Sequence, residues 1–348
     1  MKNTLQKSGR FIAFGCVLST LLFISCSEEV LESDAQILSE DQGLEIALKA
    51  DPLEPIIIDD LTPTVLKTTE AAGEDRGRFN ITLRYAETPT DRQKEVFEAA
   101  AARWERIIIK DVSSFTGSLP SAFENVPDIE GTIDDIVIEV LLRPIDGPRG
   151  ILGRAGPRFI RLDNFLTLSG VMEFDSDDLA FLDQLDLFED VIVHEMGHVL
   201  GIGTLWNLNF PQFNFSRNLL TGTFQQPFFA GDNANVFWNA EGGTGELPIE
   251  NEFGPGTRFG HWKESTLNNE LMTGFLNFGE NPLSRITAAS MRDLGYGSAT
   301  VGESYALPKG TPGVDINELS RTEENSGLNI AEMEVLLKPI GFVSTKKE

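Results

Sequence analysis

The sequence predicts an α+β fold, because segments with the periodicity of strands and segments with the periodicity of helices both occur along the chain. Every second residue of 79–85 is apolar, which indicates a strand with one buried face. Apolar residues recur at helical spacing through 91–109, and Thr90 stands where a helix cap is expected. The nearly continuous apolar run 136–142 predicts a strand at the centre of a sheet.

The chain beyond this central strand combines turn signals with further strand and helix patterns. The glycines of 147–156 predict a loop, and they do not match a phosphate-binding loop because no Gly-Lys-Ser/Thr follows. A strand is expected at 170–174. The acidic run 175–178 favours the capped start of a helix, with a Ca²⁺ site as the weaker alternative. A later helix is expected at 284–294, closed by a glycine.

The chain has only three histidines, and two of them, His194 and His198, lie in the pattern H-E-x-x-H. Acids at 189–190 and apolar flanks predict a buried helix over 187–200. Residues four positions apart share a helix face, so both imidazoles can bind one metal ion. Glu195 is then expected to take a proton from a zinc-bound water. An accidental match on a surface helix is the alternative, and the apolar flanks argue against it.

The third ligand of such a site is not settled by the motif itself. A catalytic zinc ion takes three protein ligands and keeps one position for water. His261 is the only remaining histidine, and the alternative is one of the 54 Asp and Glu residues of the chain. Gly201 follows His198 by three residues and can turn the chain sharply in a left-handed conformation.

The pattern H-E-x-x-H-x-x-G resembles the metzincin peptidases. In compact metzincins a third histidine follows three residues after the glycine, but here that position is Thr204. The Gly-His-Trp sequence at 260–262 and the Glu-Leu-Met-Thr-Gly sequence at 270–274 resemble the leishmanolysin family, in which a long insertion separates the second and third zinc histidines. The resemblance covers about residues 78 to 307.

This resemblance implies one catalytic Zn²⁺ held by His194, His198 and His261, with Glu195 as the catalytic residue. It also implies that Met272 is the methionine of the Met-turn beneath the zinc, with Met291 as a weaker candidate. The domain contains no cysteine, so the cysteine-based latency of the eukaryotic members is not expected here.

The resemblance further implies a metzincin-like catalytic domain over 78–307. Its upper subdomain, 78–201, would hold a twisted mixed sheet with two long helices above the cleft. Its lower subdomain, 202–307, would be loop-rich, and the high content of Asn, Gly, Phe and Pro in 207–260 agrees with this expectation. We expect an acidic tether or short prosegment at 26–77, and a C-terminal tail of unknown role at 308–348.

Composition excludes some classes of partner. The 348 residues carry 28 Lys and Arg against 54 Asp and Glu, which gives a formal net charge of −26. Nucleic-acid binding is excluded because phosphate recognition needs a basic surface. A protein or peptide substrate is the expected partner.

The first 25 residues have the pattern of a targeting segment. Lys2, Lys7 and Arg10 precede an uncharged stretch at 11–25 that is too short to span a bilayer comfortably. A small residue directly before Cys26 resembles a bacterial lipobox, which implies lipidation of Cys26 and membrane attachment through a lipid anchor only. We therefore expect an outer membrane lipoprotein exposed at the cell surface. The alternative is an ordinary signal peptide and a secreted protein.

Three functions remain open at this stage. The leading interpretation is a zinc metalloendopeptidase that hydrolyses peptide bonds with a zinc-bound water activated by Glu195. The alternative is a non-enzymatic surface lipoprotein, an adhesin or binding module, that retains a structural metal site. The third is a hydrolase of non-peptide amides. The intact Glu195 favours an enzyme, because a structural metal site has no use for an uncoordinated carboxylate beside its ligands.

Overall fold

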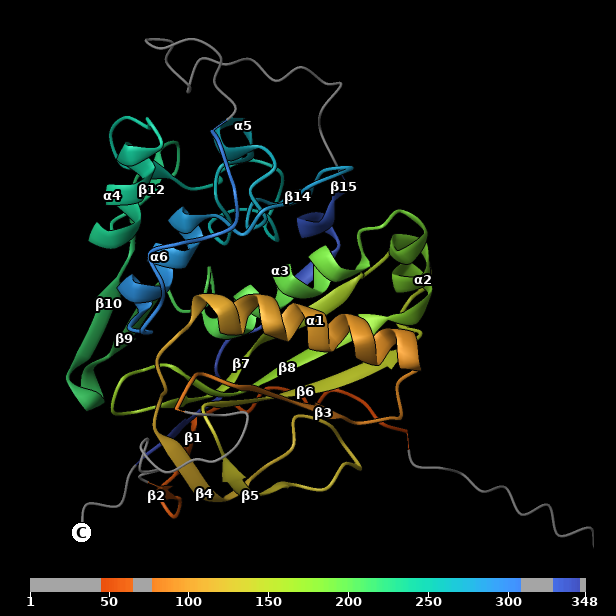
Figure 1. The fold of residues 1–348 in the computed structure, drawn as a ribbon. Coiled ribbons are helices and arrows are strands. Elements are labelled where there is room, and N and C mark those ends of the chain that lie inside the picture. The colour runs from red at the N-terminus through yellow and green to blue at the C-terminus, as the bar shows by residue number, and fades with distance from the viewer. Residues whose placement is uncertain (1–44, 65–76, 308–327, 345–348) are drawn as a thin grey trace, which may run out of the picture. The chain divides into compact units, whose positions relative to one another are not determined.

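A seven-stranded sheet of mixed direction lies at the centre of the molecule (Figure 1). The computed structural model describes residues 45–64, 77–307 and 328–344, and the statements below concern these residues. The strands of the sheet are β1 (Ile56–Ile58), β3 (Ile81–Tyr85), β6 (Ile136–Arg143), β7 (Gly153–Arg161), β8 (Thr167–Asp175), β16 (Glu334–Leu336) and β17 (Gly341–Val343). Their order is β1-β17-β7-β8-β6-β3, and β16 also pairs with β7.

Strand direction divides this sheet into two halves. Strands β3, β6 and β8 are mutually parallel, and β7 runs antiparallel to β8. Strands β16 and β17 both pair with β7 in parallel, one beside its beginning and the other beside its end, and β1 pairs with β17 in parallel. The expected strands at 79–85, 136–142 and 170–174 are confirmed as β3, β6 and β8.

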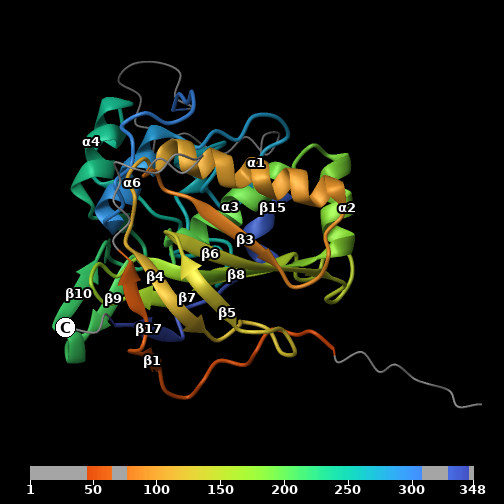
Figure 2. The same ribbon diagram turned by 60° about the horizontal axis from the view of Figure 1, so that its bottom comes forward.

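Both faces of the sheet are buried, which explains the continuous apolar sequence of β6. Side chains alternate along a strand, so Ile136, Ile138 and Val140 pack with the helices while Val137 and Leu141 face the other side. That other side is covered by the small antiparallel sheet seen below the main sheet in Figure 1 and brought forward in Figure 2. Its strands are β2 (Thr62–Thr64), β4 (Ser114–Leu119) and β5 (Ile129–Ile133), in the order β2-β4-β5.

Three helices lie between residues 91 and 200: α1 (Asp91–Ile107), α2 (Ser176–Gln184) and α3 (Phe188–Leu200). Thr90 caps α1 in a capping box with Gln93, as its position in the sequence predicts. Figure 1 shows α1 and α3 lying across one face of the main sheet. Helix α3 has 11 buried residues among its 13, so it runs through the core.

The chain after α3 forms short elements joined by longer irregular segments. These elements are β9 (Asn207–Phe210), η1 (Pro211–Phe213), β10 (Phe215–Asn218), β11 (Leu220–Gly222), β12 (Pro227–Phe229), α4 (Asp232–Ala240), β13 (Leu247–Pro248), α5 (Glu264–Leu267), β14 (Phe275–Leu276) and α6 (Arg285–Leu294). Strands β9 and β10 form one hairpin, and β11, β12 and β13 form a three-stranded sheet. Helix α6 begins after Ser284 and ends at Gly295, as the sequence predicts.

Three segments take roles that the sequence did not indicate. Gly153 and Gly156, expected in a loop, lie in strand β7, where the ring of Phe174 and the carbonyl of Leu337, respectively, leave no room for a side chain. Residues 56–58, assigned to a tether or prosegment, form β1 at the sheet edge. Residues 328–344, assigned to a tail, form β15 (Leu328–Asn329), η4 (Ile330–Glu332), β16 and β17.

None of the helices in the ranges that the structure describes is both long enough and apolar enough to cross a bilayer. The leader and Cys26 lie outside these ranges.

Candidate metal centre

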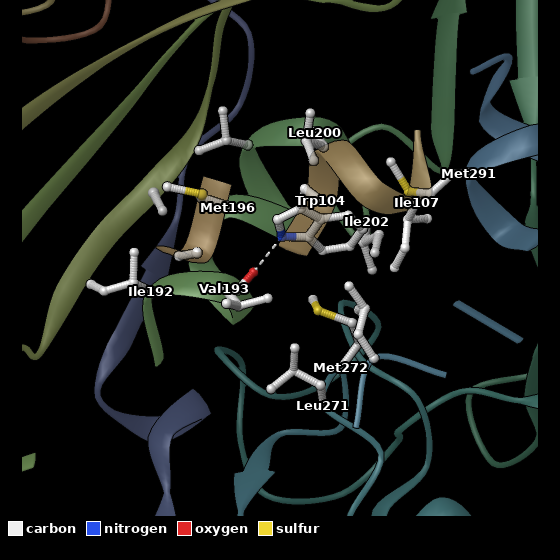
Figure 3. Packing of buried hydrophobic residues seen from close by; sticks show 14 of the residues in the cluster. Trp104, Ile107, Ile192, Val193, Met196, Leu200, Ile202, Leu271, Met272 and Met291 are labelled. Carbon is white, nitrogen blue, oxygen red and sulfur yellow. Dashed lines mark hydrogen bonds between the residues drawn. The ribbon is translucent and has the colours of Figure 1, made fainter. Parts of the chain in front are cut away.

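Helix α3 presents His194 and His198 on one face, one turn apart. Their Nε2 atoms lie 2.9 Å apart, and both side chains are fully buried. The helix is fixed in this position by the side chain of Trp104 on α1, whose indole N–H donates to the carbonyl of Val193 at 2.8 Å (Figure 3). The pairing of α1 with α3 therefore determines where the two imidazoles lie.

The end of α3 supports the second imidazole. Gly201 adopts a φ of 124°, a left-handed conformation that favours glycine, and its N–H donates to the carbonyl of Gly197. The chain then turns so that the carbonyl of Ile202 lies 2.9 Å from Nδ1 of His198. The glycine of the H-E-x-x-H-x-x-G pattern thus supplies the turn that orients one ring.

The third histidine comes from the segment before α5. Nε2 of His261 lies 3.1 Å from Nε2 of His194 and 3.1 Å from Nε2 of His198. The N–H of Trp262 donates to the carbonyl of Met272, which ties this segment to residues 270–274. The structure therefore brings together the three histidines that the sequence analysis singled out.

All three rings are oriented by backbone carbonyls. Nδ1 of His194 lies 2.7 Å from the carbonyl oxygen of Leu271, and Nδ1 of His261 lies 2.9 Å from the carbonyl oxygen of Thr257. Nδ1 of His198 lies 2.9 Å from the carbonyl oxygen of Ile202. A carbonyl only accepts hydrogen bonds, so each Nδ1 carries the proton and each Nε2 is left with a lone pair. Three lone pairs therefore converge on one point.

A fourth group, which no sequence pattern indicates, completes the cluster. Glu334, in strand β16, is fully buried at its side chain, and its Oε1 lies 2.9 Å from Nε2 of His261. Its Oε2 lies 3.4 Å from Nε2 of His194 and 3.8 Å from Nε2 of His198. The four residues offer ligand atoms that all lie within 4.8 Å of one another. No motif surrounds Glu334 in the sequence, so nothing distinguished it from the other acids.

The donor set fits a divalent cation. The carboxylate oxygens of Glu334 and Glu195 are buried and have no hydrogen-bond donor among the described residues. Buried lone pairs and charges without partners are costly, and a cation among them removes that cost. Nitrogen and carboxylate oxygen ligands in a set of four suit Zn²⁺. Burial, together with the negative charge of Glu334, raises the pKa of Glu195 well above its usual value.

The turn that carries the carbonyl of Leu271 is fixed by Glu270. This buried carboxylate accepts hydrogen bonds from the N–H of Met272 (2.7 Å), from the N–H and hydroxyl of Ser284, and from the hydroxyl of Thr287 (2.6 Å). Helix α6 therefore holds the turn in place. The side chain of Met272 lies against α3 beside Trp104, whereas Met291 lies on α6, as Figure 3 shows.

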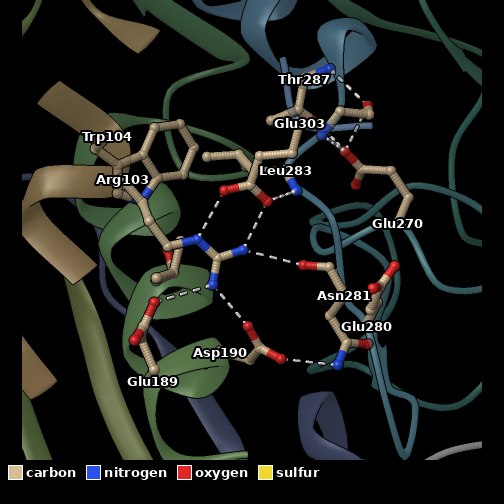
Figure 4. A network of polar contacts seen from close by, with 12 residues as sticks. Arg103, Trp104, Glu189, Asp190, Glu270, Glu280, Asn281, Leu283, Thr287 and Glu303 are labelled. Atoms are coloured by element: carbon tan, nitrogen blue, oxygen red, sulfur yellow. Dashed lines mark hydrogen bonds and ion pairs between the residues drawn. The ribbon is translucent and has the colours of Figure 1, made fainter. Parts of the chain in front are cut away.

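A second polar network holds the beginning of α3. Arg103 of α1 donates to Asp190 at 2.7 Å and to both carboxylate oxygens of Glu303 at 3.0 and 2.8 Å (Figure 4). It also donates to the carbonyl of Asn281 at 3.1 Å. This guanidinium joins α1, the first turn of α3 and the segments on either side of α6.

The acidic run 175–178 forms the helix start that the sequence favoured. Asp175 is the N-cap of α2, and its carboxylate accepts from the backbone N–H groups of Asp177, Ile145, Asp146 and Gly147. Its oxygens are thus occupied by backbone donors. The expected alternative, a Ca²⁺ site, has no support in this arrangement.

Comparison with known proteins agrees with the geometry. A family model described as leishmanolysin matches residues 116–312. The match includes His194, Glu195, His198 and His261, whereas Glu334 lies beyond it. A search of curated proteins found no match to the chain. The matched region covers more than half of the sequence, and the chain belongs to the leishmanolysin family of metallopeptidases.

Proposed function

We propose that the protein is a zinc-dependent endopeptidase that binds Zn²⁺ through His194, His198 and His261 and uses Glu195 as its general base. One observation carries this proposal. Three imidazoles with satisfied Nδ1 atoms direct their Nε2 lone pairs at one point, next to a buried carboxylate that has no hydrogen-bond partner. A protein core that needed no metal and no base would not keep these groups together.

The metal ion and Glu195 would have separate roles in peptide hydrolysis. Zn²⁺, when bound, would polarise the scissile carbonyl and lower the pKa of water from about 16 to roughly 7. Glu195 would accept the proton of the attacking water and return it to the leaving amine.

A second candidate function has one observation in its favour. Glu334 brings the number of protein ligand atoms to four, and closed sites with four protein ligands are typical of structural zinc. This would suit a non-enzymatic adhesin or binding module. The buried carboxylate of Glu195 argues against it, since a structural site gains nothing from an unpaired acid beside its ligands.

The experiment that tests the proposal separates metal binding from catalysis. The purified full chain is loaded with Zn²⁺ and incubated with unfolded casein, with and without a chelator. Glu195→Gln should retain zinc and lose cleavage by about 10²- to 10⁴-fold, the range typical of a general base. Glu98→Gln, an exposed acid of α1, is the matched control and should behave as the parent. Cleavage by Glu195→Gln at the parent's rate would refute the proposal.

We also propose that the protein is a lipoprotein of the outer membrane, exposed at the cell surface and anchored through Cys26. The support is the basic leader and the small residue before Cys26. Cys26→Ala should move the protein from the membrane fraction to the soluble fraction. Unchanged fractionation would contradict the lipid anchor.

A further inference from the structure

The segment 328–344 enters the metal centre from outside the region that builds it. The three histidines, Glu195 and the turn at 270–274 all precede residue 277 in the chain. The segment returns to this region as β15, which pairs with β14 directly after that turn. It then continues through η4 to β16, and Glu334 is the first residue of β16. A functional centre that is otherwise complete thus receives one added carboxylate.

This segment occupies the strand edge beside the metal centre. Glu334, Val335 and Leu336 pair with Gly153, Arg154 and Ala155 of β7. The carbonyl of Met333 accepts from the N–H of Leu152 at 2.7 Å, and the N–H of Leu337 donates to the carbonyl of Ala155 at 2.8 Å. An extended peptide that adds to a sheet edge needs these same backbone groups. A substrate cannot bind there while β16 is in place.

Several glycines make room for the segment. A Cβ at Gly156 would overlap the carbonyl of Leu337, and one at Gly256 would overlap the carbonyl of Ala331. A Cβ at Gly260 would lie 2.7 Å from the side chain of Leu336. The walls of the site are therefore shaped to admit this stretch of chain at close range. The segment is therefore packed as an integral part of the fold.

The segment places a side chain, and not a peptide carbonyl, at the metal centre. Hydrolysis of the segment itself would require one of its peptide carbonyls at this place. The contacts of 2.9 to 3.8 Å to the three Nε2 atoms are made by the carboxylate oxygens of Glu334. A catalytic zinc site needs one position free of protein ligands, and this carboxylate would fill it when the metal is bound. Glu334 and Leu336 also line a cavity of about 490 Å³ with Trp206 and Arg258, so open space continues beyond the segment.

We propose that residues 328–336 are an intramolecular inhibitor, in which Glu334 takes the remaining position on the metal and β16 fills the β7 edge. This inference rests on the proposed function. Strand β17 lies between β7 and β1 and anchors the segment, so release needs only the displacement of the short stretch before it. The fraction of molecules with this stretch displaced then sets the observed activity.

The test uses the full chain, loaded with Co²⁺ for spectroscopy and with Zn²⁺ for activity. Glu334→Ala should retain the metal through the three histidines, change the visible absorption of Co²⁺, and raise casein cleavage by about tenfold or more. Glu332→Ala is the matched control, because Glu332 is exposed, lies two residues away and should alter neither readout. Gly156→Ala should also raise cleavage, since its methyl group displaces the segment without removing Glu334.

The outcomes separate this inference from the proposed function. An unchanged Co²⁺ spectrum in Glu334→Ala would show that the carboxylate does not bind the metal, and would overturn the inference. A changed spectrum with equal cleavage by parent and variant would overturn the inhibitory role and leave the peptidase function intact. A changed spectrum with no cleavage by any variant would overturn both and favour a structural metal site.

Discussion

Gly197 lies directly against the side chain of Met272. A Cβ at Gly197 would stand 2.7 Å from Cε and 2.8 Å from Sδ of Met272, and 3.0 Å from the ring of Trp104. The position directly before His198 therefore has no room for a side chain. The thioether of Met272 fills the place where a longer residue on α3 would lie, and so contacts the helix at the level of the ligands.

Gly197→Ala should destabilise the protein, because the added methyl group forces Met272 to shift within a packed core. Overpacking of this kind costs about 1–3 kcal/mol in the free energy of unfolding. Chemical denaturation of the zinc-loaded protein measures it. The double variant Gly197→Ala with Met272→Leu tests the contact, because leucine has a different shape and should change the loss in unfolding free energy caused by Gly197→Ala. If the losses of the two single variants simply add in the double variant, the two residues are not in contact.

Met272→Ala should leave a cavity against α3, cost about 2–5 kcal/mol, and accelerate zinc release. Met272→Leu conserves volume and should cost less than about 1.5 kcal/mol. Met291→Ala is the matched control: it is equally buried but lies on α6, so it should lose stability alone. Thermal melts and zinc release to a chelator check this. Faster zinc loss from Met291→Ala would show that the wrong methionine was assigned to the turn.

Asp175 should make the free energy of unfolding decrease as the solution becomes acidic. Burial favours its neutral form, but hydrogen bonds from backbone N–H groups, that of Ile145 foremost, lower the pKa of Asp175 below its usual value. The folded state therefore binds this proton less tightly than the unfolded state does. The stabilisation is fully present above about pH 4 and is lost as the pH falls through the folded pKa.

The difference in unfolding free energy between the parent and Asp175→Asn should accordingly be largest near neutral pH and shrink below about pH 4. Denaturation at a series of pH values gives this difference directly, and loss of metal in acid affects both proteins alike. Asp177→Asn, an exposed acid of the same helical turn, is the control. If the difference in unfolding free energy between the parent and Asp175→Asn stays constant down to the lowest pH, the carboxylate does not have this role.

Arg103→Ala should destabilise the protein by about 2–4 kcal/mol, somewhat less than a fully buried pair because one partner is partly solvated. The change leaves Asp190 and Glu303, with side chains 15% and 33% exposed, without their common partner. Arg103→Lys should recover only part of the loss, since an ammonium cannot bind both oxygens of Glu303 in the same way. Arg106→Ala, exposed on the same helix, should be nearly neutral. Equal effects at positions 103 and 106, measured by chemical denaturation, would refute the network.

The regular elements of the first half of the domain could be predicted because their burial produces periodic sequences. The alternation in 79–85, the cap at Thr90 and the apolar run of β6 each reflect one or two buried faces. The three histidines could be expected to meet because two share a helix face and the chain offers only one more. Strand β7 was not predicted because its glycines, which allow close contacts with neighbouring residues, look in sequence like the glycines of a loop.

Glu334 could not be found by the same reasoning. Its strand has three residues, which is too short to show a periodic pattern, and it forms by pairing with a distant edge. An acid that reaches the metal centre through tertiary structure looks the same in sequence as an acid on the surface. The sequence left open an acidic third ligand in place of His261, chosen from 54 Asp and Glu residues, but it did not indicate an acid in addition to the three histidines.

The pairing of β1 with β17 has a consequence for how the molecule folds. Ile56 meets Gly341, so two strands that lie far apart in the sequence must find each other before this edge of the sheet can form. Contacts so distant in sequence close late and slow the search for the native state. The histidines and Glu195 can assemble before this last step, whereas Glu334 arrives with it. Folding in this order would bring the three histidines and Glu195 together before Glu334 covers them.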